Sequence, residues 1–147
     1  MDLNGDQLLS GTPTQVYDLL QDPEVLAAVM PGCDTLNRID DDTFEGVIKA
    51  KLGPISSTYK AKFKLSDRNP PHSYQLKIDG QGPGGFVQGY TKISLSEEAE
   101  GTRLTYTGEA TVGGKIASIG QRLVESGAKI IIKQGFKALK TEIENSL

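Results

Sequence analysis

The sequence has few of the residues that metal centres and disulfide frameworks need. Its 147 residues include one histidine, one cysteine and no tryptophan. A single cysteine excludes an intramolecular disulfide, and one histidine with one cysteine cannot supply the ligands of a usual zinc site. The lone cysteine is in keeping with a reducing compartment. We therefore expect no metal site in this chain.

Long apolar runs and an excess of basic residues are also missing. The sequence contains no run of about 18 apolar residues that could span a membrane. No apolar segment follows a basic stretch at the N-terminus, as it would in a signal peptide. The formal net charge is −3, which gives no electrostatic footprint for nucleic acid. We expect a cytoplasmic protein that binds no nucleic acid and meets a membrane only peripherally, at the inner face of the cell membrane.

The composition is that of an ordinary soluble domain. Apolar residues make up 37% of the chain and charged residues 24%. A chain of this length fits one domain and buries roughly 70% of its unfolded surface, enough for a core and a modest cavity. The sequence shows no repeat, linker or low-complexity tract, so we predict a single domain over residues 1–147.

Two short helices are expected after a first strand at residues 2–10. Thr12 to Gln15 has the form of a capping box, with proline at the first helical position. Asp22-Pro23 opens a second helix in the same way, and Pro31-Gly32 ends it.

Apolar and polar residues then alternate with the period of a strand. The clearest alternation covers residues 55–65, and a turn is expected before it at Gly53-Pro54. Short turns between successive strands predict an antiparallel sheet with one wet face. The predicted strands after the helices are 44–52, 55–65, 74–78, 86–96 and 104–112.

The last segment, from Gly114 to the end, contains no proline and has helical periodicity. As one helix it would be on the order of 45 Å long. Gly120, Gly127 and Gly135 interrupt it, and each costs roughly 1 kcal/mol relative to alanine. Two explanations stay open: the glycines allow close packing of helix on sheet, or they leave room for a ligand.

This order of elements predicts an α+β helix-grip fold. A curved antiparallel sheet of about seven strands would wrap around the long C-terminal helix, with two short helices after strand 1. The gap between sheet and helix is then the natural ligand site. The residues expected to line this mainly apolar cavity are Met30, Phe44, Ile48, Ser57, Tyr59, Phe63, Tyr74, Leu76, Ile78, Phe86, Tyr106, Ile116, Ile119, Gly120, Leu123 and Gly127.

No catalytic residue stands out among the titratable side chains. His72 lies in a predicted turn, and Cys33 has no histidine near it in sequence. Alternation places Glu45, Asp79 and Glu109 on the outer face of the sheet. The glycine-rich stretch 80–85 is followed by a strand and not by the helix that a phosphate-binding loop requires. We therefore expect a binding protein without a catalytic site.

Six lysines share the outer face of the predicted sheet. They form either a solvated face that resists aggregation or a docking surface for anionic lipid or an acidic partner. These lysines are Lys49, Lys51, Lys60, Lys62, Lys64 and Lys77.

Several motifs in this order resemble the family of the G subunit of carbon monoxide dehydrogenase, within the START-like, polyketide-cyclase-like helix-grip superfamily. The resemblance covers nearly the whole chain. The motifs are Asp22-Pro23-Glu24-Val25-Leu26 running to Met30-Pro31-Gly32-Cys33, Leu52-Gly53-Pro54-Ile55 with Tyr59, Gly80-Gln81-Gly82-Pro83-Gly84-Gly85-Phe86 with Gly89, and Val112-Gly113-Gly114-Lys115-Ile116-Ala117 to Gly120-Gln121-Arg122-Leu123.

The resemblance implies a non-catalytic accessory protein of a molybdenum hydroxylase. Such proteins are thought to recruit the dehydrogenase to the membrane or to bind a hydrophobic electron acceptor such as a quinone. Tyr59, Tyr74 and Tyr106 could hydrogen-bond quinone carbonyls, or they could simply pack and bond to backbone or water. Some relatives carry a membrane-anchoring helix that this sequence lacks, so we expect no direct anchoring. A cyclase- or dehydratase-type enzyme and a general hydrophobic-ligand adaptor stay open as alternatives.

Overall fold

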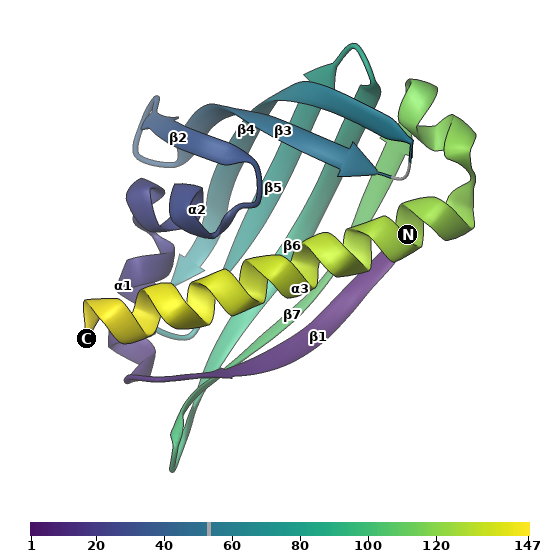
Figure 1. Cartoon of the computed structure of the whole chain (residues 1–147). Coiled ribbons are helices and arrows are strands. Elements are labelled where there is room, and N and C mark those ends of the chain that lie inside the picture. Colours follow the sequence, from purple (N-terminus) through teal and green to yellow (C-terminus); the bar gives the residue numbers. More distant parts are fainter. Residues whose placement is uncertain (53) are drawn as a thin grey trace.

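The computed structural model describes residues 1–52 and 54–147 and confirms the predicted helix-grip fold (Figure 1). Within these residues, seven strands form one curved antiparallel sheet in the order β1-β7-β6-β5-β4-β3-β2. The strands are β1 (Asp2–Leu9), β2 (Cys33–Arg38), β3 (Thr43–Leu52), β4 (Ile55–Asn69), β5 (Ser73–Gly82), β6 (Gly85–Glu98) and β7 (Gly101–Gly113).

The two short helices begin where the sequence predicts. In α1 (Pro13–Leu20), the Gln15 amide donates to the Thr12 hydroxyl at 3.2 Å, and the Thr12 amide donates to the Gln15 side chain at 2.9 Å. This capping box satisfies two amides that the first helical turn leaves unpaired. In α2 (Pro23–Val29), the Asp22 carboxylate accepts from the Glu24 amide at 2.9 Å.

The strand alternation predicted from the sequence is clearest in β4, where buried and exposed residues follow one another. Tyr59, Ala61, Phe63 and Leu65 point to the concave face and are at most 5% exposed. The lysines between them point to the convex face. Because the neighbouring strands pair in register with β4, their apolar residues gather on the same concave face.

The long helix α3 (Gln121–Ser146) crosses the concave face diagonally, and α1 and α2 fill the same side near its C-terminal end (Figure 1). At 1.5 Å per residue its 26 residues span roughly 39 Å. Buried residues of α1, α2, α3 and the sheet form one apolar core. None of the described helices is long and apolar enough to cross a membrane.

The structure differs from the sequence prediction at β2 and in the segment that follows Gly114. Strand β2 was not predicted, and it pairs with β3 at the far edge of the sheet. The expected single helix from Gly114 is wrong: residues Gly114–Ile119 form a 3-10 helix, and Gly120, at a φ of 98°, separates it from α3. A positive φ of this kind ends helical geometry and favours glycine. The turn predicted at Gly53-Pro54 falls partly on Gly53, which lies outside the described residues.

Candidate functional site

Most residues predicted to line a cavity lie instead within the packed core. Phe44, Phe63 and Tyr74 are at most 2% exposed and belong to the main apolar cluster. Side chains of α1 and α2 pack against them, and the Tyr17 ring meets the Tyr74 ring edge-on at 5.6 Å. Five further predicted residues pack half-buried against this cluster: Met30, Ile48, Leu76, Ile78 and, at its edge, Tyr106. This half of the concave face is therefore filled by the protein's own side chains.

A second, smaller cluster lies toward the first turns of α3. Tyr59 and Ile116 are buried in it with Leu52, and Ile119 packs against them. Ser57 stands nearby, where its hydroxyl accepts from the Gly84 amide at 3.0 Å. This serine therefore holds the turn between β5 and β6.

Three predicted cavity residues point elsewhere. The Phe86 side chain lies on the convex face, because the alternation of β6 turns Val87 inward, and its ring covers Gly113 of the paired strand. Leu123 is 50% exposed on α3, and Gly120 is exposed, with nothing within 4 Å of the position that a Cβ atom would take. The prediction that these residues line the cavity is wrong.

The glycines of α3 also differ from one another. A Cβ atom on Gly127 would overlap the side chain of Leu52, so this glycine permits close packing of helix on sheet. The alternative, that Gly127 leaves room for a ligand, is therefore wrong at this position. A Cβ atom on Gly135 would meet the Val29 carbonyl oxygen at 3.6 Å, an ordinary contact.

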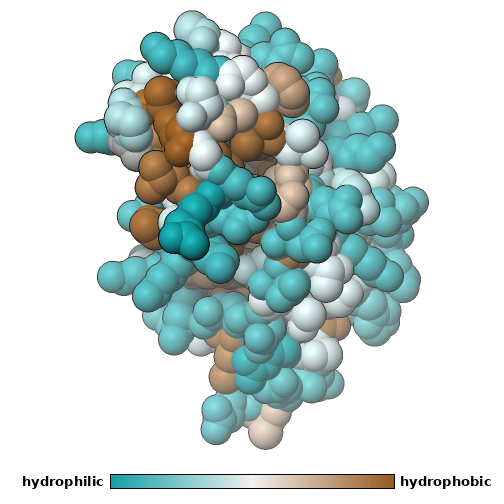
Figure 2. All heavy atoms as spheres, turned by 90° about the vertical axis from the view of Figure 1, so that its right-hand side faces the viewer, coloured by the Kyte–Doolittle hydropathy of each residue, from teal (hydrophilic) through white to brown (hydrophobic). Residues whose placement is uncertain are grey.

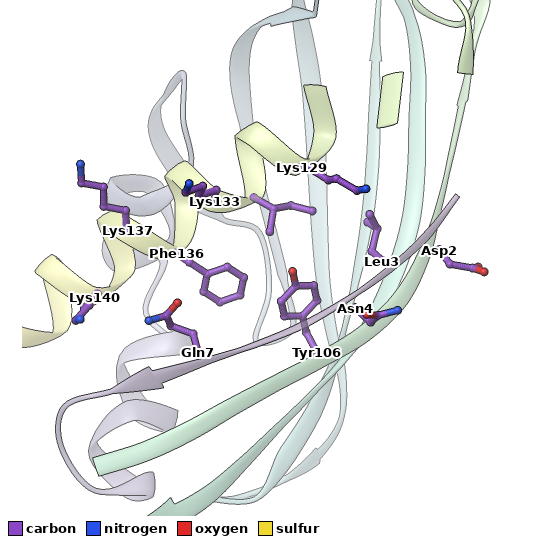
Figure 3. Close-up of a pocket in the computed structure, with 11 residues that line it drawn as sticks. Asp2, Leu3, Asn4, Gln7, Tyr106, Lys129, Lys133, Phe136, Lys137 and Lys140 are labelled. Carbon is purple, nitrogen blue, oxygen red and sulfur yellow. The ribbon is translucent and has the colours of Figure 1, made fainter. Parts of the chain in front are cut away.

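A cleft of about 620 Å³ opens between the edge strand β1 and one flank of α3 (Figure 3). Tyr106 is the one predicted cavity residue that lines it. Leu3 of the strand forms the apolar wall with Ile132 and Phe136 of the helix, beside the polar Gln7 of the strand. The remaining lining residues are polar or charged: Asp2, Asn4, Lys129, Lys133, Lys137 and Lys140.

Two aromatic rings form the centre of this wall. Phe136 points from α3 toward Tyr106 of β7, and the rings stack with centroids 5.1 Å apart and planes 23° from parallel (Figure 3). Burial, with a smaller contribution from Asp6, raises the pKa of the Tyr106 hydroxyl above its ordinary value. The hydroxyl therefore keeps its proton at neutral pH and can donate a hydrogen bond.

A smaller hollow of about 250 Å³ lies at the other end of α3, lined by Gln121, Val124 and Glu125 of the helix and by Val112 of β7. Figure 2 views the molecule from the side of the 3-10 helix and the first turns of α3, and shows an apolar patch within a mostly hydrophilic face. In α3, Leu123 and Ile130 are 50% and 58% exposed. Neither residue lines the β1–α3 cleft.

The two candidates for a catalytic side chain, His72 and Cys33, do not line the cleft. His72 is exposed in the turn between β4 and β5. Burial and the nearby Asp34 raise the pKa of the Cys33 thiol, which makes it less reactive as a nucleophile. Among residues 1–52 and 54–147, no three His, Cys, Asp or Glu side chains are grouped to hold a metal ion.

The six lysines predicted as a docking surface are all exposed on the convex face. Acidic side chains interleave with them: Lys60 pairs with Glu45 at 3.0 Å, and Lys62 lies in register between Glu45 and Asp79. Lys64 and Lys77, by contrast, are direct cross-strand neighbours. The face is therefore of mixed charge, and its role in docking stays a prediction.

The cleft residues of β1 and α3 were missed by reasoning from the sequence. On the helix, the lining residues recur every three or four positions from 129 to 140, which marks one flank of a helix. This spacing can be read from the sequence, but the lysines in it are typical of a helix face that meets only solvent. Only the diagonal course of α3 over the sheet shows that this flank faces β1.

Comparison with known proteins finds similarity over nearly the whole chain. Residues 5–144 match the model of the family of the G subunit of carbon monoxide dehydrogenase (CoxG). A conserved protein from Geobacillus kaustophilus is 36% identical, with a TM-score of 0.93 over 99% of this chain and 97% of that chain. The search of curated proteins found no match.

More distant solved structures share the fold alone. A protein from Chromobacterium violaceum is 16% identical, with a TM-score of 0.75 over 97% of this chain and 96% of that chain. A protein from Thermus thermophilus is also 16% identical, with a TM-score of 0.72 over 99% of both chains.

Proposed function

The chain belongs to the family of the G subunit of carbon monoxide dehydrogenase (CoxG), and from that membership we propose that it is an accessory protein that carries a hydrophobic ligand. The ligand would occupy the cleft between β1 and α3. A quinone-like electron acceptor for a molybdenum hydroxylase of the carbon monoxide dehydrogenase type is the ligand we favour. Bringing that hydroxylase to the membrane would belong to the same role.

The stacked Tyr106–Phe136 pair at the centre of the cleft is the observation that carries this proposal. A flat quinone ring can stack against this pair, since offset aromatic contacts contribute about 0.5–1.5 kcal/mol beyond area burial. The protonated Tyr106 hydroxyl supplies a donor for a quinone carbonyl. Leu3 and Ile132 extend the apolar wall for an alkyl tail.

An enzyme of the cyclase or dehydratase type would need an acid or base beside the bound ligand. Among the described lining residues, Asp2 is the one carboxylate. It is exposed and extends away from the two rings (Figure 3). The cleft therefore supports binding better than catalysis by a carboxylate.

Extraction of the native protein tests the proposal. The chain is purified without detergent, extracted into organic solvent, and the extract is examined by mass spectrometry. We expect a quinone or another long-chain apolar molecule in the native extract. The variant Leu3→Trp, which fills the cleft, should carry less of it, whereas Leu123→Trp, outside the cleft, should carry the native amount.

Repeated absence of any apolar molecule, together with no binding when a short-chain quinone is titrated in, would contradict the carrier role. Equal loss of ligand in both tryptophan variants would contradict its placement in this cleft. Retention of a molybdenum hydroxylase on the tagged chain tests the partnership separately from the ligand.

A further inference from the structure

Four lysines follow one another along the flank of α3 that borders the cleft. Lys129, Lys133, Lys137 and Lys140 are all exposed, and their spacing of four, four and three residues keeps them on one side of the helix. We call them the α3 lysine row. Figure 3 shows them extending from the helix around the Tyr106–Phe136 pair.

The α3 lysine row is not neutralised within the protein. Ion pairs within the described part of the chain use Lys60, Arg68 and Arg103, and none uses a lysine of α3. Between residues 126 and 141 the sequence contains no acidic residue. Glu125 and Glu142 lie just beyond this stretch, and Asp2 is the acid nearest to it in the cleft lining.

The charge of this flank also contrasts with that of the rest of the molecule. Subtracting the four lysines from the formal net charge of −3 leaves −7 for the remaining residues. An anionic surface would therefore attract the α3 flank, whereas the remaining residues taken together are repelled. Such an asymmetry orients a protein before it makes contact.

From this arrangement we propose that the α3 lysine row is the face that docks on an anionic lipid bilayer, with the mouth of the cleft turned toward the membrane. The row borders the cleft along α3, so docking places the apolar wall of the cleft near the membrane from which an apolar ligand would enter. Entry of the ligand from the membrane rests on the proposed function, whereas the docking itself rests on charge and geometry.

The convex face offers the matched comparison. It also carries exposed lysines, but Glu45, Asp79 and Glu109 stand among them. Lys60 is engaged by Glu45 at 3.0 Å. A charge in such a mosaic gains less from an anionic surface than a charge in an unbroken row, because the neighbouring carboxylates are repelled.

Vesicle co-sedimentation tests the proposal with two charge-matched variants. In one, Lys129, Lys133, Lys137 and Lys140 are changed to Gln; in the other, Lys49, Lys51, Lys64 and Lys77 are changed to Gln. Both variants lose four positive charges, so their net charges are the same. Vesicles are made of phosphatidylcholine alone or of phosphatidylcholine with phosphatidylglycerol, and circular dichroism checks that each variant is folded.

The native chain should bind the anionic vesicles and be released by salt. Because each lysine near an anionic surface contributes about fivefold in partitioning, the α3 variant should lose at least about tenfold. The convex-face variant should lose much less, because its lysines would face away from the bilayer and the attraction falls off within a Debye length. Binding to phosphatidylcholine alone should be weak for all three proteins.

Three outcomes would overturn the proposal: no binding of the native chain to anionic vesicles, equal losses in the two variants, or a larger loss in the convex-face variant. The last of these would assign docking to the convex lysines. Ligand content measured by extraction is a separate readout. A native chain that carries ligand but does not bind vesicles would contradict the docking inference and leave the carrier proposal standing.

Discussion

Tyr74 and Tyr106 point to the same concave face but sit in different surroundings. Tyr74 is 2% exposed within the core, whereas Tyr106 is half-buried in the wall of the cleft. Burial raises the pKa of both hydroxyls. The tyrosines therefore divide into one that packs the core and one that is available to a ligand, a division that strand alternation alone does not reveal.

The buried Tyr74 hydroxyl predicts a loss of stability at alkaline pH. Its pKa in the folded state lies well above the ordinary value of 10.0, chiefly because burial disfavours the charged form. The unfolded chain therefore loses the proton first, and the free energy of unfolding falls as pH rises above the ordinary pKa. Urea unfolding at neutral and alkaline pH should show a smaller fall for Tyr74→Phe than for the native chain. An unchanged fall would contradict this account of Tyr74.

Phe136 predicts a loss of binding that is larger than the loss of stability. The residue is half-buried at the cleft, so Phe136→Ala should cost less than the roughly 3–5 kcal/mol of a fully buried phenylalanine. Removing the ring that stacks on Tyr106 should nevertheless weaken binding of a short-chain quinone by about tenfold, since an aromatic contact and its buried area are both lost. Calorimetric titration with thermal unfolding measures the two effects together. A quinone affinity that is unchanged in this variant would place the ligand elsewhere.

At the scale of elements, helix α3 touches its surroundings differently along its length. Gly127 lies against Leu52, whereas Gly135 has room for a methyl group. We expect Gly127→Ala to destabilise the fold by about 1–3 kcal/mol through overpacking. Gly135→Ala should stabilise it by about 0.5–1 kcal/mol through helix propensity.

Chemical denaturation of both glycine variants provides the measurement, and the sign of the difference is the readout. Equal stabilisation by the two alanines would mean that Leu52 does not restrict position 127. In that case the space beside the helix would have to be reconsidered as room for a ligand.

The strands could be predicted from the sequence more fully than the site. Apolar and polar residues alternate over residues 55–65 because one face of the strand packs on the core and the other meets water. Another local pattern, the capping box with Gln15, located the capping residue Thr12. Strand β2 was not predicted, since its burial pattern shows a single buried residue, Leu36. The prediction for Phe86 failed because an aromatic ring does not reveal which face of a strand it takes.

The cleft could not be predicted because it depends on how distant elements meet. Leu3 and Tyr106 become neighbours through the pairing of β1 with β7, and Phe136 joins them through the course of α3. In addition, α1 and α2 occupy the half of the concave face where a cavity was expected. No local sequence pattern records that occupation.

At the scale of the whole molecule, the concave face has a filled half and an open edge. Helices α1 and α2 close the filled half, and β1, an edge strand paired only with β7, borders the open one. Edge strands with one partner exchange their amides more readily than central strands do. A ligand in the cleft should therefore protect β1 and the middle of α3 most.

Hydrogen exchange with and without a short-chain quinone measures this protection. We expect slower exchange in residues 2–9 and 129–140 on addition of the quinone, with little change in β3, β4 and β5. Protection that appears mainly in β3 to β5 would instead favour a ligand inside the core, in contradiction to the cleft.

The most direct test of the central claim uses the absence of tryptophan from the chain. The variant Phe136→Trp carries a single fluorescent reporter inside the cleft, and Leu123→Trp carries one outside it on the same helix. The two variants are titrated with a short-chain quinone, which quenches tryptophan fluorescence on contact. The account predicts saturable quenching at position 136 and only weak, non-saturating quenching at position 123. Equal, non-saturating quenching of the two reporters would contradict it.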